Sequence, residues 1–130
     1  MKMENRSRVA VYLLEGPDLW EQKWQCYQFA LWRKLDVCAV YTDESDSQVA
    51  FKAMLRDYAT GHFDAVLIQK LDRLGRDPAF LFAIEHIIRI YPALEPQPLP
   101  AEHDDPNPSI FMKTVHQHRR RLANLMNSEV

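Results

Sequence analysis

Short, continuously apolar runs alternate along this chain with longer segments in which large apolar side chains recur every third or fourth residue. A continuous apolar run that stops at turn residues is typical of a strand buried on both faces, whereas spacings of three and four are typical of an amphipathic helix. We expect strands at residues 9–14, 37–41 and 65–68. Strands that alternate with helices predict an α/β fold with a mostly parallel sheet and helices on both faces.

The segment after the first strand predicts a helix. Asp18 is available as its N-cap, and Glu21 follows at the spacing of a capping box. The apolar stripe of this helix consists of Trp20, Trp24, Tyr27, Leu31 and Leu35. We interpret the stripe, together with Trp32, as a core face or a subunit-contact face in preference to a platform for stacking nucleic-acid bases.

Two further helices follow the second and third strands. The buried face of the earlier one is marked by Phe51, Met54, Leu55 and Tyr58. That helix ends at Gly61, a residue type that favours helix termination. After a loop over residues 70–76, Asp77 and Pro78 supply the N-cap and the first-turn proline of the next helix.

The region after the third helix is rich in proline. Six of the eight prolines lie between residues 91 and 108, and because proline cannot donate to a sheet ladder we expect only an edge strand there, at residues 93–99. Asn107 and Pro108 begin a long last helix. We therefore divide the chain into an α/β domain at residues 1–106 and a C-terminal helix at residues 107–130. This helix either packs back on its own domain or forms a dimer contact.

The composition is that of one globular domain, with 130 residues, of which 47% are hydrophobic and 26% charged. A net charge of −2 excludes a wholly basic DNA-binding surface, so DNA contact should be local and weak. We expect Cys26 and Cys38, which lack metal-ligand spacing, to be buried thiols in the reducing cytoplasm. No apolar run is long enough for a leader or a membrane span, so we expect a cytoplasmic protein with no membrane partner, metal or cofactor.

The most informative segment is the loop after the third strand, which carries Arg73 and Arg76. Ligands gather at the carboxyl edge of parallel sheets, and each guanidinium offers paired donors that fit phosphate oxygens. Gly75 allows a sharp turn between the two arginines. Spacing alone, however, favours a structural role in which Asp72 and Asp77 pair with them.

In sequence this loop, residues 72–77, reads Asp-Arg-Leu-Gly-Arg-Asp and follows an apolar strand and Lys70. It resembles the signature loop of the serine recombinases, the resolvase and invertase family, and the similarity to their catalytic domain extends over about residues 8–90, with Gln25 in the first helix. The resemblance implies a resolvase-like fold whose long last helix builds a dimer and approaches DNA. It also implies a reaction in which a serine attacks a DNA phosphodiester and forms a 5′-phosphoserine link, while arginines stabilise the phosphoryl group.

The chain departs from this family pattern where the attacking serine belongs. The family has tyrosine-x-arginine-x-serine after the first strand, but Leu14 stands at the arginine position and Gly16 at the serine position. A further family arginine at the start of the second helix is replaced by Gln48. Loss of a nucleophile costs on the order of 10⁶ in rate, which the remaining arginines cannot restore. The resemblance then leaves phosphate or DNA contacts to Arg73, Arg76, Arg119, Arg120 and Arg121, with Asp72, Gly75 and Gln25 supporting the loop.

Our leading hypothesis is therefore a degenerate, catalytically inactive serine recombinase domain that serves as a binding or regulatory module in DNA recombination or mobile-element biology. One alternative is an active recombinase that uses Ser45 or Ser47, in the loop after the second strand, as a relocated nucleophile. The other is an interaction protein that pairs through its last helix, as a homodimer or as a heterodimer with an active recombinase that it inhibits.

Overall fold

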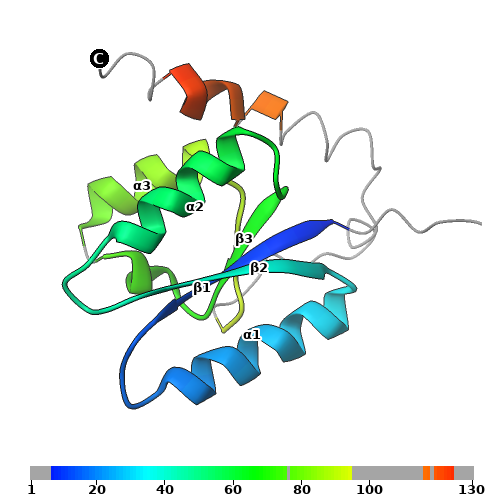
Figure 1. The fold of residues 1–130 in the computed structure, drawn as a ribbon, viewed down its shortest axis with the longest axis vertical. Helices are drawn as coiled ribbons and strands as arrows, with labels where there is room; N and C mark the ends of the chain where they lie inside the picture. The colour runs from blue at the N-terminus through cyan, green and yellow to red at the C-terminus, as the bar shows by residue number, and fades with distance from the viewer. Residues whose placement is uncertain (1–6, 76, 95–115, 118, 125–130) are drawn as a thin grey trace, which may run out of the picture.

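The computed structural model describes residues 7–75, 77–94, 116–117 and 119–124. Within them lies a four-stranded, all-parallel sheet in the order β2-β1-β3-β4 (Figure 1). Its strands are β1 Arg8–Leu14, β2 Asp36–Asp43, β3 Ala65–Ile68 and β4 Ile90–Pro92. The α/β architecture and the three strands expected from the apolar runs are confirmed.

The fourth strand is an edge strand, as the prolines require, but it lies before the expected residues 93–99. Ile90 packs against the core on one face of the sheet and Tyr91 against the core on the other, so this pair behaves as strand. Ala93 still donates a backbone hydrogen bond of 2.7 Å to Ile68, which continues the pairing one residue beyond Pro92. Residues 95–99 lie outside the described part of the chain.

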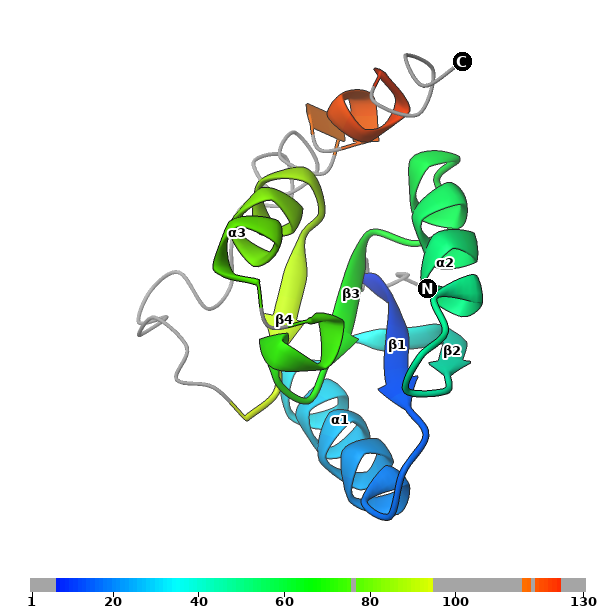
Figure 2. The ribbon, with the colours of Figure 1, turned by 90° about the vertical axis from the view of Figure 1, so that its left-hand side faces the viewer.

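Helices cover both faces of the sheet, as predicted. Helix α1, Leu19–Arg33, lies on one face, whereas α2, Val49–Ala59, and α3, Pro78–Ile87, lie on the other (Figures 1 and 2). Alternate side chains of β1 serve the two layers: Val9 and Val11 pack with the α1 layer, and Ala10 and Tyr12 with the α2 and α3 layer. β1 is thus a central strand buried on both sides.

Most of the apolar residues that we expected on the buried face of α1 lie on its exposed face. Its buried residues are Gln22, Cys26, Phe29 and Ala30, whereas Trp20, Trp24, Tyr27 and Leu31 are exposed. The polar Gln22 is accommodated on the buried face by hydrogen bonds to the backbone of Leu14. Hydrophobic size alone therefore selected the wrong face, and the subunit-contact and base-stacking interpretations are the ones that stay open.

Of the two predicted N-cap aspartates, one caps its helix and the other does not. Asp77 caps α3 as predicted, accepting a hydrogen bond of 3.1 Å from the Ala79 amide, with Pro78 in the first turn. Asp18 occupies the N-cap position of α1, but its side chain makes no capping hydrogen bond, so the predicted capping box with Glu21 is absent. The Asp18 carboxylate is instead used in the site described below.

The two cysteines differ in burial, which corrects the expectation of two buried thiols. Cys26 is buried in the α1 layer, and burial raises the pKa of its thiol to about 12. Cys38 is exposed because it lies on β2, an edge strand of the sheet.

The described C-terminal residues, 116–117 and 119–124, are helical and lie beside the ends of α2 and α3 (Figures 1 and 2). Leu122 is buried in the same core cluster as Tyr58 and Ile84, so this part packs back on its own domain. The remainder of the predicted last helix lies outside the described residues, and its dimer contact stays a prediction.

Two observations limit the kinds of site that the described residues form. None of their helices combines the length and the apolar character that crossing a bilayer requires. They also include no group of three or more His, Cys, Asp or Glu side chains placed to hold a metal ion.

Candidate functional site

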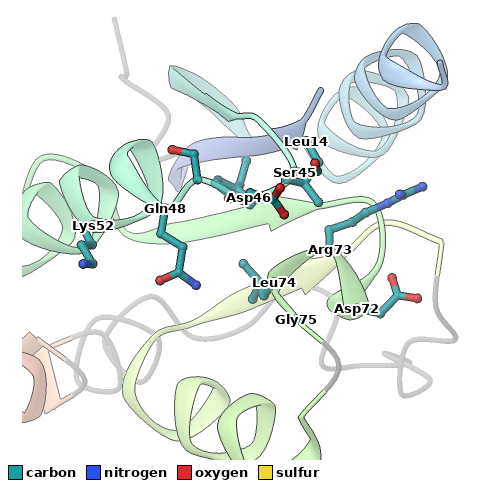
Figure 3. A pocket seen from close by; sticks show the side chains of 11 residues that line it. Leu14, Ser45, Asp46, Gln48, Lys52, Asp72, Arg73, Leu74 and Gly75 are labelled. Atoms are coloured by element: carbon teal, nitrogen blue, oxygen red, sulfur yellow. The ribbon is translucent and has the colours of Figure 1, made fainter. Parts of the chain in front are cut away.

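A pocket of about 630 Å³ opens where the carboxyl ends of β1, β2 and β3 meet (Figure 3). Its lining comprises Tyr12 and Leu14 of β1, residues 45–48 after β2, Lys52 of α2 and residues 72–75 after β3. The sequence placed Arg73 on the same sheet edge as Ser45 and Ser47, and the pocket confirms that placement. This is the edge at which parallel sheets bind ligands.

Arg73 does not extend into the pocket toward Gln48 and Lys52 but runs toward helix α1 (Figure 3). It lies in a 3₁₀ helix, η1 Leu71–Leu74, within what the sequence predicted as a loop. Its guanidinium forms an ion pair with Oδ2 of Asp18, and its Nε and Nη2 donate to Oε1 of Gln69, at 2.9 and 2.6 Å. The sequence suggests that the Arg73 guanidinium binds a phosphate, but in the structure this group is already bound by side chains of the same chain.

For Arg73 this pairing corrects the expected one, in which nearby Asp72 and Asp77 pair with the arginines of the loop. Asp77 caps α3, and Asp72 is exposed at the rim of the pocket. Asp18 is far away in sequence, so its approach to Arg73 could not be inferred from local spacing. Arg76 lies outside the described residues.

Gln25 and Gly75 support the loop in ways that the structure makes specific. Gln25 of α1 accepts a 2.6 Å hydrogen bond from Nε2 of Gln69, and Gln69 in turn holds Arg73. Gln25 therefore acts on the loop through one intermediate side chain. Gly75 has a φ of +144°, which favours glycine, and a Cβ there would lie 3.7 Å from the Phe80 ring.

The electrostatics of Asp18 reflect its two partners. Desolvation acts to raise the pKa of this carboxyl, but the hydrogen bond from Gln22 and the charge and hydrogen bond of Arg73 outweigh it, so the pKa lies below the ordinary value of an aspartic acid. Asp18 is therefore ionised at neutral pH and neutralises Arg73. The Gln22 hydrogen bond to Oδ1 of Asp18 measures 3.0 Å and leaves Oδ2 for the arginine.

Gln22 also fixes the end of β1. Its side chain is fully buried, accepts a 3.0 Å hydrogen bond from the Leu14 amide and donates a 2.8 Å hydrogen bond to the Leu14 carbonyl. The apolar Leu14 side chain lines the pocket. The backbone is thus held rigidly at the position where the family pattern has an arginine.

Gly16 lies in the exposed turn between β1 and α1. A Cβ built on it would lie 3.5 Å from Oδ1 of Asp18, an ordinary contact distance, and Gly16 is not one of the glycines with positive φ. The turn therefore has space for a side chain, although this chain provides none. Gly16 therefore supplies no side-chain oxygen beside the Arg73–Asp18 pair.

Asp43, at the end of β2, organises the opposite side of the pocket. Its buried carboxylate accepts hydrogen bonds from the Ala50 amide at 2.8 Å, the Phe51 amide at 2.9 Å and the Tyr12 hydroxyl at 2.8 Å. Burial, followed by the bond to Asp43, raises the pKa of Tyr12 well above its usual value. Asp43 thus caps the first turn of α2, a role that sequence reasoning missed because residues 44–48 separate this aspartate from the helix.

Ser45 and Ser47 both line the pocket, and of the two only Ser47 forms side-chain hydrogen bonds with other residues that the structure describes. Its hydroxyl donates to Oδ1 of Asp43 at 3.5 Å and accepts from the Val49 amide at 3.3 Å. These contacts belong to the loop that leads into α2. The Asp43 oxygens are already engaged by the helix amides and Tyr12, so this carboxylate is poorly placed to act as a general base for Ser47.

Lys52 is a pocket residue that the sequence analysis did not select. It lies one helical turn after Gln48 on α2, and both side chains line the pocket (Figure 3). The spacing of four from the family arginine position was the available signal. Asp46 and Asp72 share the lining with Lys52 and Arg73, so the lining carries two negative charges beside two positive ones.

The basic residues near the C-terminus have separate roles. Arg119 is largely buried, with its side chain 13% exposed, and it donates to the carbonyls of Tyr58 and Phe63 and to Oδ1 of Asp64 at 2.9 Å. Arg121 donates to the His86 carbonyl at 3.1 Å. Arg120 is exposed. Arg119 therefore anchors the C-terminal segment, and Arg120 and Arg121 are the more accessible cations.

Comparison with known proteins places these features in context. Residues 13–91 match the family model described as Resolvase, N terminal domain. No curated protein sequence matches the chain significantly.

Three solved structures share the fold. A resolvase family site-specific recombinase from Streptococcus pneumoniae gives a TM-score of 0.63 at 18% identity, over 95% of each chain. The N-terminal catalytic domain of TP901-1 integrase gives 0.55 at 20% identity, over 91% of this chain and 98% of that one. The C-terminal catalytic domain of ISC1926 TnpA, an IS607-like serine recombinase, gives 0.55 at 21% identity, over 75% of this chain and 74% of that one.

Proposed function

Because the chain belongs to the resolvase N-terminal domain family, we propose that it acts in DNA recombination as a binding or regulatory module that does not cleave DNA. The observation that carries this proposal is the geometry at the end of β1. Gly16 offers no nucleophile there, and the nearby cation of Arg73 is neutralised by Asp18. Family membership supports the link to recombination, and these two features support the loss of strand cleavage.

The magnitudes favour inactivity over slow catalysis. Removing the nucleophile from a catalytic group that works as a unit costs on the order of 10⁶ in rate. Removing one donor that stabilises developing negative charge costs about 10²–10³ more. Here Leu14 stands where a donor is expected, and Arg73 is occupied by Asp18 and Gln69. Nothing in the described pocket compensates for losses of that size.

The pocket charge also disfavours a tightly held phosphate. Lys52 and Arg73 are opposed by Asp46 and Asp72 along the lining, and Asp18 adds another negative charge beside Arg73. Phosphoryl-transfer sites stabilise the transferred group by concentrating positive charge around it. We therefore assign DNA contact chiefly to exposed cations outside the pocket, such as Arg120 and Arg121, with weak and strongly salt-dependent affinity.

The alternative of a relocated nucleophile has one specific observation in its favour, since Ser45 and Ser47 line the same pocket as Arg73. The contacts of Ser47 with Asp43 and the Val49 amide are those of a helix-start loop, and Arg73 is turned away toward α1. Both features favour the inactive form.

A plasmid-cleavage assay tests the proposal. The full chain is incubated with negatively supercoiled plasmid and the products are separated under denaturing conditions, with an active family member as the positive control. We expect no protein-dependent nicked or linear product. Cleavage that disappears in Ser45→Ala or Ser47→Ala, but not in the matched variant Ser109→Ala, would overturn the proposal in favour of the relocated nucleophile.

A regulatory role requires a partner, and the family relationship supports an active recombinase or a second copy of the chain. Sedimentation of the protein alone and mixed with an active family member tests this part separately. We expect a complex larger than either monomer. Only monomers in both samples would remove the regulatory role while leaving the loss of cleavage intact.

A further inference from the structure

Helix α1 presents a row of large apolar side chains to solvent. Trp20 is 78% exposed, Trp24 64%, Tyr27 41% and Leu31 74%. These residues lie opposite the core-facing side of the helix, which consists of Gln22, Cys26, Phe29 and Ala30. We refer to Trp20, Trp24, Tyr27 and Leu31 as the α1 seam. Contiguous exposed apolar surface of this kind marks an interaction site in soluble proteins.

The spacing of the α1 seam matches a particular kind of partner. Its members are separated by four, three and four residues, which is the a/d spacing of a helix that packs along another helix. Among the elements that the structure describes, α1 is the one helix on its face of the sheet, away from α2, α3 and the described C-terminal residues (Figures 1 and 2). No described element of the chain covers the seam, so an α-helix from another molecule fits it.

We propose that the α1 seam binds the α1 seam of a second copy of this chain, with the two helices antiparallel. The first turn of α1 carries exposed Glu21, and the helix ends at exposed Lys34. An antiparallel arrangement brings Glu21 of each helix near Lys34 of the other and opposes the two helix dipoles favourably, while Lys23 lies over the Trp20 ring of its own helix, 4.9 Å from the ring centroid. The register that sets Glu21 across from Lys34 also sets Trp24 across from Leu31 of the other copy.

A parallel pair lacks this complementarity. It would place Glu21 beside Glu21 and Lys34 beside Lys34, and it would align the helix dipoles in the same direction. The same charges thus favour one orientation of a self-complementary contact, as two-fold symmetry requires.

The size of the α1 seam sets the expected strength. With 15 residues, α1 is about 22 Å long, and a single helix of that length covers less than the roughly 800 Å² per partner of a standard stable interface. We therefore expect a reversible dimer with a dissociation constant on the order of micromolar or weaker. The contact needs neither the pocket nor the C-terminal segment, which lies on the opposite face of the sheet from α1.

Sedimentation velocity of the full chain over a range of concentrations tests the contact. We expect a monomer–dimer equilibrium for the unmodified protein and a loss of dimer in Trp24→Glu. The matched control is Phe82→Glu, because Phe82 is similarly exposed, at 64%, but lies on α3. This variant should dimerise like the unmodified chain. A monomer at every concentration, or a dimer that Trp24→Glu leaves unchanged, would overturn the proposal.

A charge exchange tests the antiparallel orientation and also controls for folding. Glu21→Lys and Lys34→Glu should each weaken self-association by about tenfold, because each change replaces two attractive pairs of the dimer by repulsive ones. Mixing the two variants should restore association, since each then meets the opposite charge on its partner. Restoration is possible only if both variants are folded. Failure of the mixture to associate more strongly than either variant alone would contradict the antiparallel pair.

The other class of partner suggested by exposed tryptophans is a single-stranded nucleic acid. Titration with a thymine oligonucleotide, monitored by tryptophan fluorescence, distinguishes it. We expect no quenching that depends on Trp24. Quenching that Trp24→Phe reduces, in a chain that stays monomeric, would replace the proposed dimer by a nucleic-acid contact.

Discussion

Arg73 and Asp18, which are 55 positions apart in sequence, form an ion pair that ties the segment after β3 to the start of α1. The pair occupies the region where Gly16 leaves space for a side chain but supplies none. A guanidinium that the sequence suggests for phosphate binding is thereby held by a carboxylate of the same domain. This relationship determines what the pocket can do and can be tested directly.

Removing the Asp18 charge should release Arg73 for anion binding. Asp18→Asn keeps the side-chain shape and an oxygen for the Gln22 hydrogen bond but removes the ion pair. We expect the variant to bind inorganic phosphate about five- to tenfold more tightly than the unmodified chain. This change corresponds to about 1 kcal/mol of binding free energy. Titration monitored through the Arg73 Nε–H resonance checks this. Asp72→Asn is the control, because Asp72 lines the pocket but is not in an ion pair with another described residue. An equal gain in phosphate affinity in this variant would argue against a specific role for Asp18.

The same pair predicts a pH dependence of stability. The pKa of Asp18 is lowered in the folded chain, so the stabilisation from its ionised form is present above the unfolded value and is lost as pH falls through the lower folded value. Urea unfolding of the unmodified chain and Asp18→Asn should therefore differ at pH 7 and converge toward pH 3. A difference that persists undiminished at pH 3 would contradict this assignment.

Gln22 should be more important for stability than its polar side chain suggests. It is fully buried and satisfies both backbone groups of Leu14. Gln22→Ala leaves these groups and Asp18 without that partner, and we expect a loss of about 2–4 kcal/mol in the free energy of unfolding. Gln25→Ala, at a partly exposed position on the same helix, serves as the control and should cost less. Equal losses of unfolding free energy in the two variants would show that the hydrogen bonds between Gln22 and Leu14 have no special role in stability.

The C-terminal segment should be anchored by Arg119 and Leu122. Leu122 is 4% exposed and packs in the core beside α2 and α3, so Leu122→Ala should lower the free energy of unfolding by roughly 2–4 kcal/mol. Arg119→Gln should also destabilise the chain, because it removes the ion pair with Asp64. The exposed neighbour Arg120 provides the control, Arg120→Gln, with little expected change. Amide hydrogen exchange of residues 119–124 locates the effect, and unchanged protection in Leu122→Ala would contradict the anchoring role.

The sequence predicted the strands better than it predicted the faces of the helices. β3 and residues 9–14 of β1 are apolar because both faces of these strands are buried, so their identity could be inferred from local composition. The buried face of α1 could not be inferred in this way, since the larger tryptophans point to solvent while Cys26 and Ala30 pack against the sheet. Which face packs depends on the space left by the opposing layer, and no local pattern contains that information.

The site shows the same division between local and long-range information. The loop with Arg73 and Gly75 was found from its residues, and the pocket confirms that it lies at the edge of the sheet. The partner of Arg73 was assigned wrongly to nearby aspartates because Asp18 approaches only after α1 docks on the sheet. Lys52 was overlooked for a related reason, since it reaches the pocket through the packing of α2.

The most direct test of the central claim is a search for a covalent protein–DNA intermediate. The full chain is incubated with a pool of randomised DNA duplexes, quenched with denaturant, digested and examined by mass spectrometry for a nucleotide attached to a protein side chain, with an active serine recombinase treated in parallel. We predict no attached nucleotide on any residue of this chain, because Gly16 supplies no oxygen and Arg73 is held by Asp18. A nucleotide linked to Ser45, Ser47 or any other side chain would contradict the account.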